Sequence, residues 1–185
     1  MTDWTQDLPG HLDRAWHRLA EGAADPDAPG RIATLATTGP DDRPEARLVV
    51  LRGADRAAGT LEVHSDARTG KVRALSARPM AALVVWIPPD RLQIRIEAVV
   101  TIRTGAEART VWDRLPDGGR LAYGIDPPPG TPVDDALYPA RRPDPEALAV
   151  LTFGVERIET LHLGSPHRRA VFGRGAGWSG RWLSP

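Results

Sequence analysis

Hydrophobic and polar positions alternate along much of the middle of the chain. In residues 91–105 the apolar side chains stand at every second position from Leu92 to Val100, and the positions between them, beginning at Gln93, are mostly polar. Because successive side chains of a strand point to opposite faces, this pattern predicts one long strand with a single apolar face. Further segments with β character lie at residues 31–37, 45–53, 60–65, 148–164 and 168–174.

Other segments break this alternation. Residues 80–87 are a continuous apolar run, which predicts a strand buried on both faces. Residues 7–22 have apolar side chains at helical spacing from Leu12 to Leu19, with Arg14 and Arg18 expected on the surface. Short helices are also expected at residues 69–79, where Thr69 is a candidate N-cap, and at 105–116.

Six or seven strands joined by tight turns, with few helices, predict a mainly β fold closed into an antiparallel barrel. The length of 185 residues fits a single domain. We expect an N-terminal helix and linker in residues 1–30, a proline-rich loop in 124–145 and an anchored C-terminal tail in 176–185. Long loops of this kind are usually functional, so the proline-rich segment is of interest.

Composition narrows the classes of function. The formal net charge is zero, which argues against a strongly basic nucleic-acid-binding protein. There is no cysteine, which excludes disulfides, thiolate catalysis and iron–sulfur clusters. No run of apolar residues is long enough for a membrane span, and the acidic N-terminal segment has no apolar signal core. A cytoplasmic enzyme or binding module is therefore expected.

The polar residues between Arg47 and Lys71 form the segment richest in candidate chemistry. Hydroxyls and cations gather there at strand ends and at a predicted helix start, an arrangement typical of anion sites. Lys71 is the only lysine in the chain. The alternative is ordinary surface charge with a helix cap, and the pattern alone leaves both interpretations open.

Other candidates are weaker. Gln93 shares the more polar face of the long strand, where its amide could contact a heterocycle if that face lines a cleft. The five histidines lack the spacings of metal sites, so no metal site is expected.

Several motifs in the same order resemble the pyridoxamine 5'-phosphate oxidase family, the FMN-binding split β-barrels. The matching segments are Arg47-Leu-Val-Val-Leu-Arg52, His64-Ser65-Asp66 with Thr69-Gly70-Lys71, Pro79 to Trp86, Gln93-Ile-Arg95-Ile-Glu97, and Trp178 with Leu183 and Pro185 near the end. The resemblance covers residues 30–103, and more loosely residues 148–185.

This resemblance implies a six- to seven-stranded split barrel that forms a homodimer, with FMN held between the subunits. It implies an FMN-binding set consisting of Arg47, Leu48, Val49, Val50, Leu51, Arg52, His64, Ser65, Thr69, Lys71 and Gln93. Within that set, Ser65 and Lys71 would bind at the phosphate end and Gln93 would touch the isoalloxazine ring. The implied activity is that of a flavin oxidoreductase which passes hydride between flavin N5 and a small molecule.

The chain also departs from the family pattern. Gly70 replaces an arginine beside Lys71, and Arg52 replaces a lysine. The tyrosine, arginine and serine with which the oxidase grips pyridoxal phosphate have no match after residue 103, where Tyr123 is the one nearby candidate. These departures point to a sister branch of the family. The alternatives are the pyridoxine/pyridoxamine 5'-phosphate oxidase itself, a non-enzymatic flavin carrier or sensor, or a barrel that binds heme or a deazaflavin.

Overall fold

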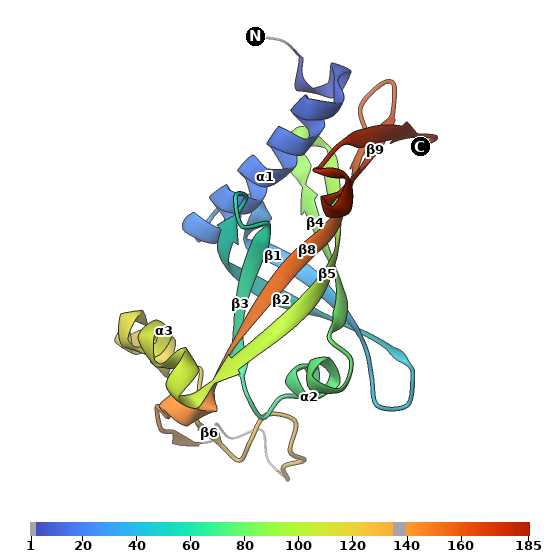
Figure 1. Ribbon diagram of the computed structural model, residues 1–185. Coiled ribbons are helices and arrows are strands. Elements are labelled where there is room, and N and C mark those ends of the chain that lie inside the picture. The colour runs from blue at the N-terminus through green and yellow to red at the C-terminus, as the bar shows by residue number, and fades with distance from the viewer. Residues whose placement is uncertain (1–2, 135–139) are drawn as a thin grey trace.

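The computed structural model describes residues 3–134 and 140–185. Its centre is a closed antiparallel barrel of six strands in the order β8–β3–β2–β1–β4–β5, in which β5 pairs back onto β8 (Figure 1). These strands are β1 (Ile32–Thr38), β2 (Pro44–Asp55), β3 (Thr60–Asp66), β4 (Met80–Ile87), β5 (Leu92–Thr104) and β8 (Leu148–His162). The mainly β barrel with short helices predicted from the sequence is confirmed.

The barrel is filled by the inward side chains of all six strands. Leu92, Ile94 and Ile96 of β5 are fully buried, as the alternation predicted, and they pack with Leu35, Leu83 and Phe153. The pairing of β5 with β8 runs from Leu92 opposite His162 to Thr104 opposite Ala149. This long ladder closes the barrel.

The expectation that residues 80–87 are buried on both faces is wrong for the isolated chain. Leu83, Val85 and Ile87 point into the barrel, but Met80 is 55% exposed and Trp86 is 43% exposed. An unbroken apolar run does not distinguish a barrel interior from an outer face that is apolar for another reason.

Helix α1 (Leu8–Ala24) lies along one end of the barrel (Figure 1). Asp7 caps it by accepting a hydrogen bond from the Gly10 amide at 2.6 Å. The predicted apolar face is confirmed, because Leu12, Ala15, Trp16 and Leu19 are buried.

Arg14 and Arg18, expected on the surface, instead bind Asp90 in the 3₁₀ turn Pro88–Asp90 between β4 and β5. The Asp90 carboxylate accepts two N–H bonds from each arginine, at 2.6–2.8 Å. These bonds connect α1 to the barrel.

Two buried histidines lie between α1 and the C-terminal strands. His11 Nδ1 is 2.9 Å from the Thr160 hydroxyl, and His11 Nε2 and His162 Nδ1 have no partner among the described residues. The Trp4 ring lies 5.2 Å from the His11 ring and 5.3 Å from the His162 ring. Burial lowers the pKa of both histidines.

The C-terminal part extends the sheet beyond the barrel. Strand β9 (Arg168–Gly173) pairs with β8, and β10 (Gly180–Leu183) pairs with β9. The two C-terminal tryptophans face α1, with Trp178 6.2 Å from Trp16 and Trp182 5.1 Å from His11 between ring centroids. These contacts join the C-terminal segment to α1, although Trp182 is 44% exposed. The anchored tail stays a prediction.

Short elements gather at the opposite end of the barrel (Figure 1). Helix α2 (Gly70–Ala77) follows β3, and residues 105–116 form a 3₁₀ turn (Gly105–Ala108) and then α3 (Arg109–Arg114), not one continuous helix. Helix α4 (Asp117–Arg120) leads into the proline-rich segment, where β6 (Ile125–Asp126) pairs with β7 (Ala140–Arg141). Part of the loop predicted at 124–145, residues 135–139, lies outside the described residues.

Candidate functional site

A cleft of about 310 Å³ lies at this second end, between β2, β3, the start of α2 and the segment after α4. Its lining residues are Leu48, Val49, Val50, Arg52, His64, Ser65, Asp66, Thr69, Lys71, Ala122, Tyr123 and Pro129. The cleft therefore brings together eight of the eleven residues in the predicted site. The other three, Arg47, Leu51 and Gln93, do not line it.

A small cluster of donors stands at the α2 side of the cleft. Lys71 Nζ donates to Ser65 Oγ at 3.2 Å, and Ser65 Oγ lies 3.1 Å from Thr69 Oγ1. Thr69 donates in turn to the backbone oxygen of Asp66 at 2.8 Å. One ammonium and two hydroxyls thus converge where the amides of α2 begin.

The electrostatics of Lys71 are those of an ammonium without a close counter-charge. Burial lowers the pKa of Lys71, and the nearby Arg47 lowers it further, while Asp66 opposes both effects. No ion pair of Lys71 is found among the described residues. A bound anion would relieve this unfavourable charge.

His64 stands next to this cluster on the cleft wall. Its side chain is only 6% exposed, and its Nε2 lies 2.8 Å from a carboxylate oxygen of Glu62. Arg103 binds the other oxygen of Glu62 at 3.3 Å. His64 Nδ1 is buried and has no hydrogen-bond partner among the described residues. A buried ring nitrogen without a partner needs an explanation, and at a cleft a bound ligand could supply the missing hydrogen bond.

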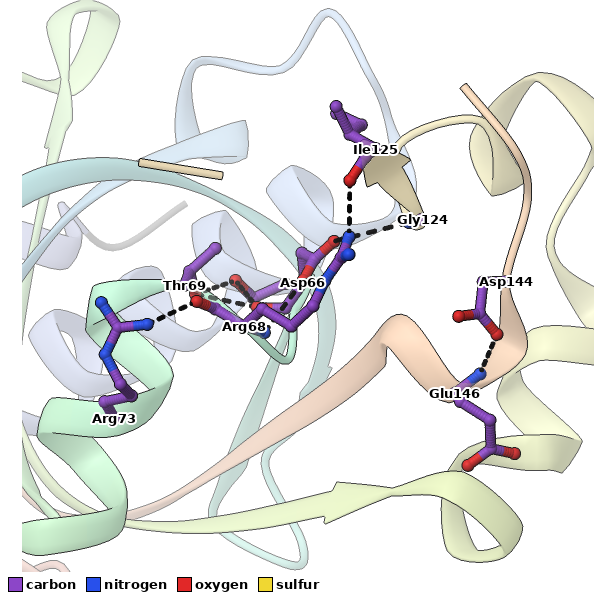
Figure 2. A network of polar contacts seen from close by, with 9 residues as sticks. Asp66, Arg68, Thr69, Arg73, Gly124, Ile125, Asp144 and Glu146 are labelled. Atoms are coloured by element: carbon purple, nitrogen blue, oxygen red, sulfur yellow. Dashed lines mark hydrogen bonds and ion pairs between the residues drawn. The ribbon is translucent and has the colours of Figure 1, made fainter. Parts of the chain in front are cut away.

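A second polar network fixes the far wall of the cleft (Figure 2). Asp66 forms two bonds with the Arg68 guanidinium at 2.7–2.9 Å and accepts a 3.4 Å bond from the Gly124 amide. Arg68 also donates to the Ile125 carbonyl at 3.0 Å. Burial opposes ionisation of Asp66, but the bonds from Arg68 and Gly124 outweigh it and lower its pKa. The β3–α2 turn therefore holds the Tyr123–Ile125 segment in place.

The alternation of β2 sorts the predicted segment 47–52 into two sets. Leu48 and Arg52 are exposed and Val50 is half-buried on the outer face, whereas Val49 and Leu51 are buried toward the barrel interior. Arg47 binds the Thr37 hydroxyl at 2.6 Å and pairs with Glu45. Only the backbone of Leu51 could take part in a site on the outer face.

Gln93 lies away from the cleft of its own chain. It is half-buried on β5, where it stands opposite Trp86 of β4 and Leu161 of β8. Thr69 occupies the predicted N-cap position of α2, but its side chain makes no capping bond. The structure adds Asp66, Ala122 and Pro129 to the site and places Tyr123 in it.

Within residues 3–134 and 140–185, no His, Asp and Glu side chains form a group of three or more that could hold a metal ion. In the same part of the chain, no helix has both the length and the apolar character needed to cross a membrane.

Residues 3–104 match the family described as "Pyridoxamine 5'-phosphate oxidase, FMN-binding domain". The chain belongs to this family. Among curated relatives, it is 31% identical over 121 residues to a pyridoxine/pyridoxamine 5'-phosphate oxidase of Pseudomonas fluorescens, covering 65% of this chain and 55% of that protein. It is 35% identical over 128 residues to the protein of the same name from Salinibacter ruber, covering 68% and 56%. The chain thus spans little more than half the length of these relatives.

Solved structures extend the likeness to the whole fold. A pyridoxamine 5'-phosphate oxidase-related, FMN-binding protein from Nostoc punctiforme has a TM-score of 0.73 at 25% identity, covering 95% of this chain and 96% of that one. PhzG from Burkholderia lata, solved with tetrahydrophenazine-1-carboxylic acid, has a TM-score of 0.67 at 17% identity, covering 96% and 90%. The second likeness concerns the fold alone.

The donors in the cleft fit the cofactor that the family name implies. A phosphate monoester needs cationic and hydroxyl donors, which Lys71, Ser65 and Thr69 offer at one point. The rest of FMN needs an extended wall with apolar surface and a few polar atoms, which β2 and His64 offer.

Proposed function

We propose that the protein binds one FMN per subunit in the cleft between β2, β3 and α2. The observation that carries this proposal is the convergence of Lys71, Ser65 and Thr69 beside an unsatisfied buried nitrogen of His64. Family membership of residues 3–104 supports it independently.

In this proposal the protein is an oxidoreductase that acts on a small molecule. Bound FMN supplies hydride chemistry at its ring nitrogen, and the protein supplies orientation and electrostatics. Lys71 would neutralise the phosphate, and the outward side chains of Leu48 and Val50 would form an apolar wall. The Tyr123–Ile125 segment, held by Asp66 and Arg68, would restrict access of water and substrate from one side.

We also propose a homodimer with the cofactor at the subunit interface. Leu48, Ile32 and Trp86 are 70%, 44% and 43% exposed, and all three lie on the outer face of adjacent strands. This apolar surface is continuous with the cleft, because Leu48 belongs to both. Exposed apolar surface of this kind marks interaction sites. Gln93, which stands opposite Trp86, would then reach the flavin of the partner subunit.

Two classes of small molecule are candidates for the substrate. The names of the curated relatives favour pyridoxine or pyridoxamine 5'-phosphate. The cleft wall favours a different small molecule, since the residues expected to grip pyridoxal phosphate have no match and the 122–129 segment stands there instead. We favour the second candidate, with a non-enzymatic flavin carrier as the remaining alternative.

Three measurements test these proposals. The absorbance spectrum of the purified protein and mass spectrometry of the released cofactor should show FMN, and a colourless protein that binds no added flavin would refute the assignment.

Light scattering should show a dimer, and a stable monomer with normal FMN affinity would refute the interface. Oxygen consumption with pyridoxamine 5'-phosphate should be weak, whereas turnover at about 1–10³ s⁻¹ would favour the oxidase.

The cytoplasmic location expected from the sequence remains a prediction, which fractionation of cells that express the protein would test.

A further inference from the structure

The arrangement of Glu62 and His64 determines which proton His64 carries. Glu62 is drawn toward its ionised form mainly by the hydrogen bond from His64, which lowers its pKa, with Arg103 adding to the effect. An ionised carboxylate can only accept hydrogen bonds. The His64 nitrogen that faces Glu62, Nε2, must therefore carry a proton.

In neutral imidazole only one nitrogen is protonated. With the proton on Nε2, Nδ1 has a free lone pair and acts as an acceptor. That Nδ1 atom is the buried one without a partner among the described residues, on a side chain that is only 6% exposed. His64 Nδ1 is thus a fixed hydrogen-bond acceptor to which a ligand could donate.

The position of His64 decides which part of a flavin could supply that donor. His64 adjoins Ser65, whose hydroxyl belongs to the cluster suited to phosphate. A phosphate has no proton to donate when ionised, whereas the polyol chain next to it carries hydroxyl donors.

We propose that Glu62 holds His64 in the Nε2-protonated form so that Nδ1 accepts a hydrogen bond from a hydroxyl of the ribityl chain. This inference rests on the proposed binding of FMN and deepens it, because it gives the site separate groups for the phosphate and for the polyol. Glu62 is a positioning residue, and His64 is the contact.

Titration of apoprotein with three flavins separates these groups. FMN has the phosphate and the polyol, riboflavin has only the polyol, and lumiflavin has neither. His64→Leu should weaken FMN and riboflavin by the same factor, about threefold to tenfold, because one neutral hydrogen bond is lost. It should leave lumiflavin unchanged. His64→Asn, which retains an acceptor oxygen near the position of Nδ1, should restore most of the affinity.

The controls use the chain itself. His17→Leu replaces an exposed histidine at the opposite end of the barrel and should alter none of the three affinities. In the unmodified apoprotein at pH 8, long-range proton–nitrogen spectra should show the His64 proton on Nε2. These spectra need no flavin.

The outcomes are distinct. If the unmodified protein binds none of the flavins, the proposed function fails and this inference fails with it. If it binds FMN but His64→Leu changes nothing, or changes FMN alone, or changes lumiflavin equally, the inference alone is overturned. A proton on Nδ1 in the spectra would overturn it as well.

Discussion

At the end of the barrel covered by α1, the buried carboxylate of Asp90 accepts four N–H bonds, two each from Arg14 and Arg18. At the opposite end, the half-buried ammonium of Lys71 donates to a hydroxyl and has no carboxylate partner among the described residues. Burial raises the cost of charge in both places. For Asp90 the arginine bonds outweigh that cost and lower its pKa, whereas for Lys71 the cost dominates and lowers its pKa.

The Asp90 carboxylate is thus a charge paired within the fold, whereas the Lys71 ammonium is a charge suited to binding a ligand. When the bonds of a buried ion are all satisfied within the chain, removal of one partner leaves an uncompensated charge and destabilises the native state. A buried ammonium that lacks a counter-charge destabilises the native state until an anion arrives. The predictions below compare the two ends of the barrel.

The largest effect is expected for Asp90→Asn. It leaves two guanidinium groups beside a neutral amide, and it should lower the free energy of unfolding at pH 7 by about 2–4 kcal/mol. Asp13→Asn is the matched control, because Asp13 pairs with Arg56 on the surface, and it should cost less than about 0.5 kcal/mol. Urea denaturation of the three proteins measures both values.

Comparison of Asp90→Asn with the unmodified protein also gives a test that uses pH. The pKa of Asp90 is lowered in the folded state, so its stabilisation is complete above its ordinary value of 3.8. It decreases progressively as the pH falls from there toward the lowered folded-state pKa. The difference between Asp90→Asn and the unmodified protein should therefore shrink at pH 3. A difference that stays constant with pH would show that the carboxylate charge is not what connects α1 to the barrel.

Lys71→Ala should have a smaller effect, and it should change FMN affinity and not the free energy of unfolding of the kind tested at Asp90. Loss of a charge-assisted bond to phosphate should weaken FMN about tenfold to hundredfold and riboflavin far less. The apoprotein should be as stable as before or slightly more stable, since an unfavourable buried charge is removed. Fluorescence quenching with both flavins, together with denaturation of the apoprotein, checks this, and equal losses for the two flavins would contradict it.

The sequence predicted these two regions unequally. The strand alternation and the order of the motifs were sufficient to locate the barrel and to collect Ser65, Thr69 and Lys71, because these residues are close together in the chain. The bonds of Asp90 to α1 and of Asp66 to Gly124 join residues more than 55 positions apart, and no local pattern indicates them. The Glu62–His64 pair was accessible in principle, since residues two apart in a strand share a face.

A further prediction concerns the stability of the protein at acidic pH and the two buried histidines at the α1 end. Burial lowers the pKa of His11 and His162 in the folded state, so the unfolded chain takes up protons first as the pH falls below about 6.5. Stability should fall between pH 7 and pH 5, by up to about 1.4 kcal/mol per pH unit for each histidine. Denaturation curves over this range should show the slope, and His162→Gln should reduce it. An unchanged slope would exclude His162 as its source.

The smallest effect is expected for Gly70→Arg. A Cβ atom at this position would come no closer than 3.8 Å to Arg73, so the backbone here should accept a side chain. It would add a cation beside Lys71 and should tighten FMN binding severalfold without changing riboflavin binding. Gly70→Ala is the matched control and should leave FMN affinity unchanged. Tighter riboflavin binding by the arginine variant would show that the added group acts on another part of the ligand.

Pairing of β5 with β8 also limits non-native association between copies of the chain. In the described residues the main sheet ends on β10, and every barrel strand pairs with a neighbour on both sides along at least part of its length. That edge is four residues long and contains Gly180 and the charged Arg181. Short, charged edges are poor templates for strand addition by other chains. The β10 edge therefore offers little backbone for aggregation, while the apolar outer face of the barrel stays available for specific association.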